Sequence, residues 1–366
     1  MKTIIRVLAF AAGLTLSFAH AHAQGTARSQ DFDLSIRSAA MGGASTGVAW
    51  GAVGVWGNPA SLSSVQGIEW AYTRTRLVPG LADDVYLTSK HLRLGGAGIG
   101  VSLSGQPFEG LGETRLDYGT SSPFVDEERI RSWAIGVSPL QVMRALGRLP
   151  GSSVLARADL AIGIQSKDTR VSLGPVSAEA TGIDAGISAR MPLLPEESRR
   201  SLEVGLGYAV LGANKQLFDF GFGLEPGTRT HRFGVATRLV LKEAFPAGVT
   251  SLNPIIGVDR TLAFTLALDR ASFGRLGEVD YNVNNLGFEA TLLGILSARI
   301  GYYDDQVGQL TDPTYGAGLH VPVGGVMAFD FDYANIPQAH DSGLPNVDRI
   351  GVNITLDPMA LAKRLK

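Results

Sequence analysis

Large apolar residues recur at every second position over many short stretches of this chain. In residues 202–210 each even position is a large apolar residue, and the odd positions are Glu, Gly or Ala. Residues 262–269 and 350–356 repeat the alternation with other small or polar residues. Successive side chains of a β-strand point to opposite faces. Each stretch therefore predicts a strand with one apolar face and one small or polar face.

About fourteen such stretches lie between residues 68 and 356. A tilted strand needs about 9–11 residues to cross a bilayer, and bacterial single-chain barrels use even numbers of antiparallel strands. The pattern therefore predicts an all-β fold: a closed antiparallel transmembrane β-barrel of about 14 strands over residues 68–356. The expected strands are approximately 68–77, 84–92, 95–105, 129–138, 154–166, 181–191, 202–212, 231–241, 262–271, 278–290, 294–304, 314–322, 325–335 and 347–356.

A soluble β-sandwich is the alternative, because strands with one buried and one solvated face alternate in the same way. The faces opposite the apolar ones are rich in Gly, Ala and Ser. A solvated face is expected to carry Lys and Glu freely, whereas small residues relieve crowding inside a barrel. The chemistry of these faces favours the barrel.

The breaks between the stretches fit hairpin connections. Tight turns are expected at 93–96 and 323–325, and long polar loops at 106–128 and 213–230. Alternation of short turns with longer loops is typical of outer-membrane barrels. Residues 96–100 place glycine at every second position and superficially suggest a nucleotide-binding loop, but their spacing favours strand alternation.

If the apolar positions face lipid, the neighbouring positions line the lumen. Both signs of charge occur there in near balance, which predicts a charge-paired, solvated inner wall; a selective pore is the alternative. Asp330 and Asp332 point the same way and can bind a cation, although two carboxylates are weak evidence for a metal, and no metal site is predicted. The expected lumen-lining residues are Glu69, Asp159, Asp184, Arg190, Glu203, Arg232, Arg238, Asp269, Glu289, Arg299, Asp330, Asp332 and Arg349.

The first 23 residues have the form of a secretory signal peptide. Lys2 and Arg6 precede an apolar run over 7–19, and Ala21-His22-Ala23 supplies small residues for cleavage after Ala23. A membrane anchor is the alternative, but about 13 apolar residues are fewer than the roughly 20 that a helical span needs. We expect the mature chain to begin at Gln24, outside the cytoplasm.

Residues 24–67 lack strand alternation and carry two short motifs. Residues 40–44 read Ala-Met-Gly-Gly-Ala, and Asn58-Pro59-Ala60 follows shortly before the first expected strand. These motifs resemble those of the FadL-like outer-membrane barrels, and more closely the PorV/PorQ branch. An uncharged, Gly-rich stretch that cannot build its own core can pack inside a barrel, where backbone must approach the wall closely.

The resemblance implies a fourteen-stranded barrel whose segment 24–67 folds into the lumen as a hatch or plug. By this resemblance the hatch residues are Met41, Gly42, Gly43, Ala44, Asn58, Pro59 and Ala60. It also implies passage of hydrophobic molecules such as long-chain fatty acids or, in PorV-type members, partnership with a protein secretion machine. A flexible leader outside the barrel is the alternative for this segment.

The C-terminal end departs from the family pattern. Barrels of this kind often end on an aromatic residue, whereas here the last strand ends near Leu356 and is followed by a short basic tail, 357–366. Asp357 and Pro358 are an N-cap and first-turn pair that predicts a short helix there. Aromatic residues are 8% of the chain, so the interfacial girdles are thin; the candidates are Trp70, Tyr72, Trp133, Tyr208, Tyr302, Phe331 and Tyr333.

Composition narrows the function classes. The chain of 366 residues has a formal net charge of −2, so no basic excess indicates nucleic-acid binding, and no cysteine provides a disulfide, a thiolate metal site or a nucleophile. His91, His231, His320 and His340 lack metal-ligand spacing, and neither a G-x-S-x-G elbow nor a phosphate-binding loop is present. We expect no enzyme activity and no cofactor.

Three functions follow from these observations. The first is passive transfer of hydrophobic small molecules past a luminal hatch, in an outer-membrane protein surrounded by lipid. The second is a membrane-embedded partner or shuttle of a protein secretion or surface-attachment system, acting through the loops at 106–128, 213–230 and 336–346. The third is a soluble periplasmic lipid-binding β protein.

Overall fold

A computed structural model describes residues 27–48, 54–80, 82–109, 127–148, 157–173, 175–194, 198–246, 258–275, 278–306, 310–339 and 342–364. The expected signal peptide, residues 1–23, lies outside the described residues, as does most of the expected loop at 106–128. No helix within the described ranges is long and apolar enough to span a membrane.

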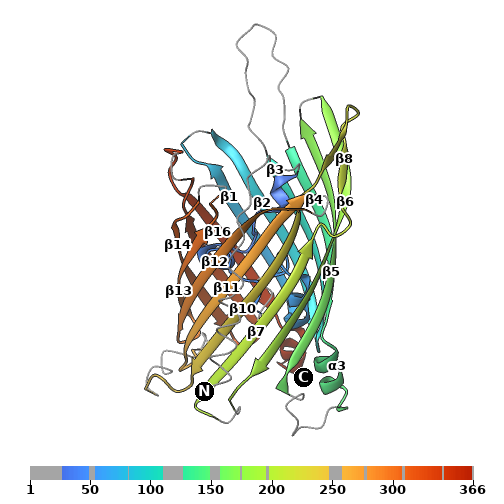
Figure 1. Ribbon diagram of the computed structural model, residues 1–366. Helices are drawn as coiled ribbons and strands as arrows, with labels where there is room; N and C mark the ends of the chain where they lie inside the picture. The colour runs from blue at the N-terminus through green and yellow to red at the C-terminus, as the bar shows by residue number, and fades with distance from the viewer. Residues whose placement is uncertain are drawn as a thin grey trace, which may run out of the picture.

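Fourteen antiparallel strands form a closed barrel in which each strand pairs with its neighbours in the wall, and β16 closes the ring on β1 (Figure 1). Closure satisfies the backbone hydrogen bonds of both strands that would otherwise be edges. The wall strands are β1 Gly67–Val78, β2 Ala82–Gly96, β3 Ile99–Glu109, β4 Glu127–Val137, β5 Asp159–Leu173, β6 Val176–Pro192, β7 Arg200–Leu211, β10 Arg229–Leu241, β11 Leu262–Arg275, β12 Glu278–Leu292, β13 Leu296–Asp304, β14 Pro313–Val323, β15 Met327–Ile336 and β16 Val347–Leu356.

Each of the fourteen strands expected from the alternation is present, and the closed barrel is confirmed. Several strands are longer than expected: lengths run from 9 residues in β13 to 17 in β6. The alternation of large apolar residues marks only the part of a strand whose outer face is apolar. It therefore underestimates the length of a strand that continues beyond that part.

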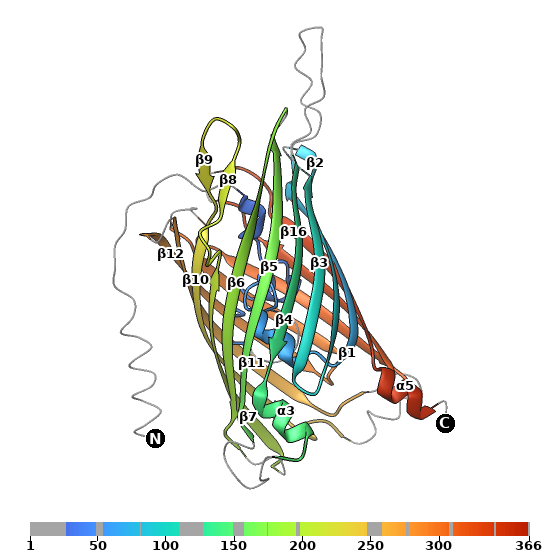
Figure 2. The same cartoon turned by 90° about the vertical axis from the view of Figure 1, so that its right-hand side faces the viewer.

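One expected connection is wrong. The turn placed at 93–96 is strand, and the chain turns instead at Ala97 and Gly98, both of which have positive φ. The long connection expected at 213–230 is present, and it contains a two-stranded hairpin, β8 Leu217–Asp219 with β9 Leu224–Pro226 (Figure 2). Three-residue strands give too short an alternation to register in the sequence.

Tight turns occur at both ends of the barrel. We call the end where β1 begins and β16 finishes the terminal end, and the opposite end the loop end. Tight turns at 97–98, 293–295 and 324–326 lie at the terminal end, whereas the loop end has a short β1–β2 connection at 79–81 as well as the longer segment 212–228. The expected segregation of short turns to one end is therefore only partial.

The terminal end also carries two short helices. Helix α3, Pro139–Ala145, follows β4, and its N-cap Ser138 accepts a hydrogen bond from the Gln141 backbone. Helix α5, Pro358–Arg364, follows β16 and projects away from the barrel wall (Figure 2). The Asp357 carboxylate accepts the backbone N–H groups at residues 359 and 360, as the N-cap pattern predicts.

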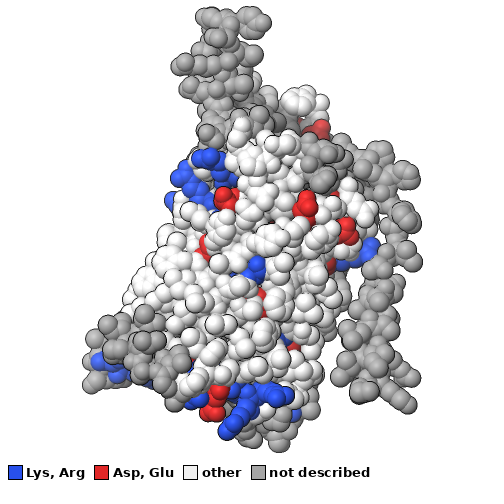
Figure 3. All heavy atoms as spheres, turned by 90° about the vertical axis from the view of Figure 1, so that its left-hand side faces the viewer, with Lys and Arg blue, Asp and Glu red and all other residues white. Residues whose placement is uncertain are grey.

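The outer surface of the wall is apolar. Every wall strand contributes at least one exposed large apolar or aromatic side chain, among them Trp70, Leu103, Trp133, Ile162 and Ile350. Figure 3 shows one side of this surface, on which charged side chains gather mainly toward the two ends of the barrel. This arrangement inverts that of a water-soluble protein, whose large apolar side chains lie inside.

The N-terminal segment packs against the inner face of the wall. It comprises the 3₁₀ turn η1 Arg28–Gln30, helix α2 Ile36–Ala40 and the 3₁₀ helix η3 Pro59–Ser64. Ser35 caps α2 and Asn58 caps η3, each by accepting a backbone N–H with its side-chain oxygen. Most residues from 34 to 48 and from 54 to 65 are buried.

Inward-facing glycines let this segment approach the wall. An added Cβ would lie 1.7 Å from Thr46 O at Gly207 and 2.0 Å from Leu62 O at Gly100, distances at which real side chains do not exist. Several of these glycines are direct cross-strand partners. The glycines that face the segment at such short range are Gly95, Gly100, Gly136, Gly163, Gly186, Gly207, Gly234, Gly287, Gly301, Gly316 and Gly351.

Substitution of a wall glycine tests this packing. We expect Gly100→Ala to lower the free energy of unfolding by about 1–3 kcal/mol, because its Cβ overlaps the Leu62 carbonyl and the segment must shift. Denaturant titration in detergent micelles measures this change, and limited proteolysis reports exposure of the segment.

Gly96 is the matched control, since nothing lies within 4 Å of an added Cβ there and its φ is not positive. Gly96→Ala should change stability by no more than about 0.5 kcal/mol. Equal effects of the two substitutions would contradict the close-packing interpretation.

Candidate functional site

A cavity of about 680 Å³ lies in the lumen toward the loop end. Its lining is largely apolar and comes from both sides of the barrel, including Leu77, Val85, Leu87, Phe273, Tyr281, Val283, Ile336 and Val347. Phe273 and Tyr281 stack with ring centroids 4.8 Å apart. A lumen wall of this kind is expected to be polar and wet, so this apolar lining is the feature of the interior that needs a functional explanation.

The N-terminal segment borders this loop-end cavity on the side that faces the middle of the barrel. Phe32 and Asp33 contribute to its lining. Arg349, which is 4% exposed, donates from Nη2 to Asp33 O at 2.5 Å and from Nε to Thr75 Oγ1 at 2.9 Å. Arg232 donates to Gly43 O at 2.8 Å. Both arginines thus tie backbone carbonyls of the segment to the wall.

Asp269 of β11 binds the backbone of the N-terminal segment at residues 45 and 46. Its Oδ2 accepts the backbone N–H groups of Ser45 at 3.0 Å and Thr46 at 2.7 Å, and Arg232 Nη2 lies 3.5 Å from the same atom. Thr314 adds a two-sided contact, because its hydroxyl accepts from Gly42 N and donates to Ala40 O. The segment is therefore held by polar contacts to its backbone as well as by packing.

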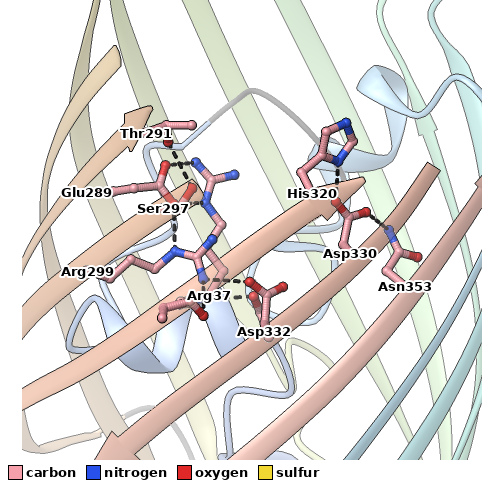
Figure 4. Close-up of polar contacts among 12 residues, drawn as sticks. Arg37, Glu289, Thr291, Ser297, Arg299, His320, Asp330, Asp332 and Asn353 are labelled. Carbon is pink, nitrogen blue, oxygen red and sulfur yellow. Dashed lines mark hydrogen bonds and ion pairs between the residues drawn. The ribbon is translucent and has the colours of Figure 1, made fainter. Parts of the chain in front are cut away.

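A second cavity, of about 400 Å³, lies toward the terminal end and is polar. Arg37 of α2 reaches into it and donates to Glu289, with nitrogen–oxygen distances of 2.5 and 2.7 Å (Figure 4). Arg299 bridges Glu289 at 2.7 Å and Asp332 at 2.5 Å. This network connects α2 to β12, β13 and β15.

The other acidic residue of β15 has separate partners. Asp330 pairs with His320 and accepts a hydrogen bond from Asn353 Nδ2 at 3.1 Å (Figure 4). Asp332 is engaged by Arg299. Of the two carboxylates that the sequence places on one face, Asp332 thus forms an ion pair and Asp330 is hydrogen-bonded. No group of three or more metal-ligating side chains occurs within the described ranges.

The remaining side of the lumen contains a fully buried ion pair. Lys167 Nζ lies 2.7 Å from Asp184 Oδ2, and both side chains are 1% exposed. The Lys167 ammonium also lies 3.8 Å from the ring centroid of Trp56, which belongs to the N-terminal segment. Charge pairing and a cation–π contact together offset the cost of burying the lysine.

The residues expected to line the lumen fall into three groups. Glu69, Arg238, Glu289, Arg299, Asp330 and Asp332 line the terminal-end cavity, and Arg232 and Arg349 line the loop-end cavity. Ion pairs join Arg190 to Asp159, Lys167 to Asp184 and Arg232 to Asp269, while Glu203 is the cross-strand partner of Arg238.

The seven residues expected in a hatch are all buried. Residues 41–43 form a turn in which Gly42 and Gly43 have positive φ, and Met41 and Ala44 pack with Val48 and wall alanines. Asn58 Nδ2 donates to the Ile187 carbonyl of β6 at 3.1 Å. Pro59 and Ala60 lie against Gly163 of β5.

Sequence reasoning missed several inward polar residues. Lys167 was missed because the expected strand ended one residue before it, and Arg93, which pairs with Glu69 at 3.1 Å, was assigned to a turn. Arg37 lies outside the strands, so no alternation of residues along a strand predicts where its side chain points. Correct strand ends would have identified Arg93 and Lys167, since both continue the inward period of their strands.

Comparison with known proteins finds similarity to solved structures alone, at low sequence identity. No protein-family model and no curated protein matches the chain. Among solved structures, the Pseudomonas putida toluene transporter TodX matches with 10% identity over 88% of this chain and 97% of that chain, at a TM-score of 0.42. Acinetobacter baumannii Omp33 matches with 10% identity over 80% and 98%, at a TM-score of 0.37.

The buried ion pair gives a stability prediction. We expect Asp184→Asn to lower the free energy of unfolding by about 3–5 kcal/mol, because it leaves the Lys167 ammonium buried without its counter-charge. The temperature at which the folded, heat-modifiable gel band disappears measures the loss.

Glu179→Gln on the same strand is the control. Its partner Arg170 lies at 3.4 Å and the two side chains are 69% and 57% exposed, so the change should be about 0–1 kcal/mol. Similar shifts for the two variants would show that burial does not set the strength of the Lys167 pair.

Proposed function

We propose that this chain is an outer-membrane barrel that transfers hydrophobic small molecules, with residues 24–67 acting as a luminal hatch. The observation that carries the proposal is the apolar cavity of about 680 Å³ enclosed by the barrel and the N-terminal segment. A cavity with this lining favours a hydrocarbon-like ligand over an ion or a sugar, because apolar atoms gain free energy on leaving water.

The outer wall supports a membrane location. Exposed large apolar side chains on every wall strand cost free energy in water and are stable against lipid tails. Trp70, Trp133, Tyr208 and Tyr302 are each about 40–50% exposed and suit the lipid–water interface. A soluble periplasmic protein with this surface would be expected to aggregate.

Orientation follows from the chain ends. An exported chain reaches the outer membrane from the periplasm, and the barrel wall begins and finishes at the terminal end. The basic residues Lys363 and Arg364 of α5 also lie there and need not cross lipid if this end remains periplasmic. On this orientation the apolar cavity opens toward the outside and the polar cavity toward the periplasm.

The route then passes the N-terminal segment. Cargo enters the loop-end cavity, and a shift of the segment connects it with the polar cavity beyond α2. The contacts that the segment makes with Asp269, Arg232 and Arg349 are mostly to its backbone. These polar contacts act together with the apolar packing of the segment against the wall, as at Met41, Ala44 and Val48. The cargo gradient supplies the driving force.

A partnership with secretion or surface-attached proteins is a second candidate. The hairpin β8–β9 projects beyond the rim of the barrel and exposes Phe222 by 76% and Leu224 by 61% (Figure 2). Exposed apolar residues on a projecting loop suit a protein contact. Recovery of specific exported proteins with the wild-type chain, and their loss with Phe222→Ser, tests this role.

Filling the apolar cavity should prevent cargo binding. Ala271 lines the cavity and is 4% exposed, so Ala271→Trp places an indole in the space that the ligand requires. We expect at least about a tenfold loss of affinity for toluene, decane or oleate in detergent-solubilised protein, equivalent to about 1.4 kcal/mol. Calorimetric or fluorescence titration measures it.

Leu268→Trp on the same strand faces outward and is the control. It should leave affinity unchanged. If none of the three probes binds to the wild-type protein, the proposed transport of hydrophobic molecules is wrong.

Release of the segment should open the lumen. Asp269→Ala removes the acceptor of the Ser45 and Thr46 N–H groups, at a cost of about 1.5–3 kcal/mol for each hydrogen bond to the carboxylate. We expect higher ion conductance in planar bilayers and faster uptake of small hydrophilic solutes by vesicles.

Asp168→Ala makes the same change on the outer wall and should leave conductance at the wild-type level. Unchanged conductance in the Asp269 variant would argue that the segment is a permanent part of the wall and not a hatch.

A further inference from the structure

Basic side chains lie on the outer wall directly beyond the apolar surface toward the loop end. On β1 and β4 the outward aromatic residues Trp70 and Trp133 are 42% and 51% exposed. Arg131 is exposed and lies on β4 two residues from Trp133, toward the loop end. Lys90 of β2 and Arg131 are both register partners of Gly105 of β3, which has no side chain to separate them.

The arginines border a defined hollow. Arg129, Arg131 and Arg170, from β4 and β5, line a cavity of about 380 Å³ together with the carboxylates Asp168 of β5 and Glu179 of β6. This cavity lies on the outside of the barrel, because the residues between them, such as Ile130 and Thr169, are 1% exposed and point inward. Outward basic groups at this position face the membrane surface and not the lumen.

The cationic groups are incompletely neutralised. Arg129 and Arg170 are direct cross-strand partners, and like charges placed opposite each other destabilise a sheet. Glu127 lies 2.5 Å from Arg129, and Glu179 lies 3.4 Å from Arg170 in a highly exposed pair of small energetic value.

Two further basic residues lack protein partners. Within the described part of the chain, the side chains of Arg131 and Lys90 take part in no hydrogen bond or ion pair, although Asp168 is the cross-strand partner of Arg131. The adjacent Asp168 carboxylate accepts from Thr181 at 2.8 Å, toward β6. Glu127 of β4 engages Arg129, and Asp168 and Glu179 lie toward β6, so the positive charge that no ion pair neutralises is that of Arg131 and Lys90, on the side toward β2.

We propose that this outward cluster, comprising Lys90, Arg129, Arg131 and Arg170, binds the phosphate groups of lipid A, the phosphorylated glycolipid of the outer leaflet. The inference rests on the proposed membrane location and orientation. Two residues along a strand rise by about 6.6 Å, which places Arg131 one headgroup layer above Trp133. Guanidinium groups bind phosphate oxygens in pairs and keep their charge, so three of them suit a doubly phosphorylated headgroup.

The test uses the full chain reconstituted in vesicles, with folding first verified by the heat-modifiable gel band. Binding of bisphosphorylated lipid A is then measured by native mass spectrometry of the detergent-extracted protein, alongside monophosphoryl lipid A, phosphatidylglycerol and inorganic phosphate. The variant carries Arg129→Gln, Arg131→Gln and Arg170→Gln. We expect its affinity for lipid A to fall by at least about tenfold, with a smaller loss for the monophosphorylated form.

Arg148→Gln, an exposed arginine at the terminal end, is the matched control and should bind lipid A as the wild-type chain does. Equal affinity of the triple variant and the wild type would overturn the site, as would binding of inorganic phosphate with the same dependence on the three arginines. A preference for phosphatidylglycerol over lipid A would also overturn it. Failure of the wild-type chain to insert would instead overturn the membrane location itself, together with this inference.

Discussion

Close contact between the backbone of residues 36–48 and 54–65 and glycines of the barrel wall is the constraint on which the interior depends. At Gly207, Gly301 and Gly100 no side chain fits between wall and segment, because an added Cβ would lie within about 2 Å of backbone atoms. Glycine is unfavourable within a strand, so these glycines do not stabilise the strands themselves. They make room for the enclosed segment. Their abundance in this sequence is the cost of seating an irregular segment inside a sheet.

That segment determines how the lumen is divided. With α2 and its flanking residues in place, apolar side chains form most of the lining of the space toward the loop end, and the space toward the terminal end has many more charged ones. The charges are paired in short contacts, as in the Arg37, Glu289, Arg299 and Asp332 network. A hydrophobic molecule thus gains free energy in the first space, whereas water and polar groups are favoured in the second.

Closure of the sheet links the two surfaces of the wall. Because side chains alternate along each strand, an apolar exterior and a small, polar interior are fixed together, and a one-residue slip of register would exchange them. The pairing of β16 with β1 removes the last free edge, so each wall strand has a hydrogen-bonded neighbour on both sides. The same alternation continues along the strands beyond Trp133, where the outward positions carry basic residues in place of apolar ones.

The sequence alone determined the barrel and the direction of most wall side chains, because period-two alternation is a local property of each strand. It also located the segment 24–67 through its lack of alternation and through the uncharged, Gly-rich stretch that begins at Ala39 within it. It did not determine the turn at Ala97 and Gly98, since glycine spaced every second residue fits a strand and a turn equally well. It placed Asp330 and Asp332 on one face but not beside His320 and Arg299.

Only the tertiary structure decided which residues meet in the lumen. Lys167 reaches Trp56, and Arg349 reaches Asp33, across more than a hundred positions of sequence. The apolar cavity likewise combines side chains from strands at the two ends of the chain, such as Val85 and Val347. Alternation fixes whether a residue faces inward, but its neighbours depend on strand tilt, register and the path of the enclosed segment, and none of these is encoded in any single stretch of the chain.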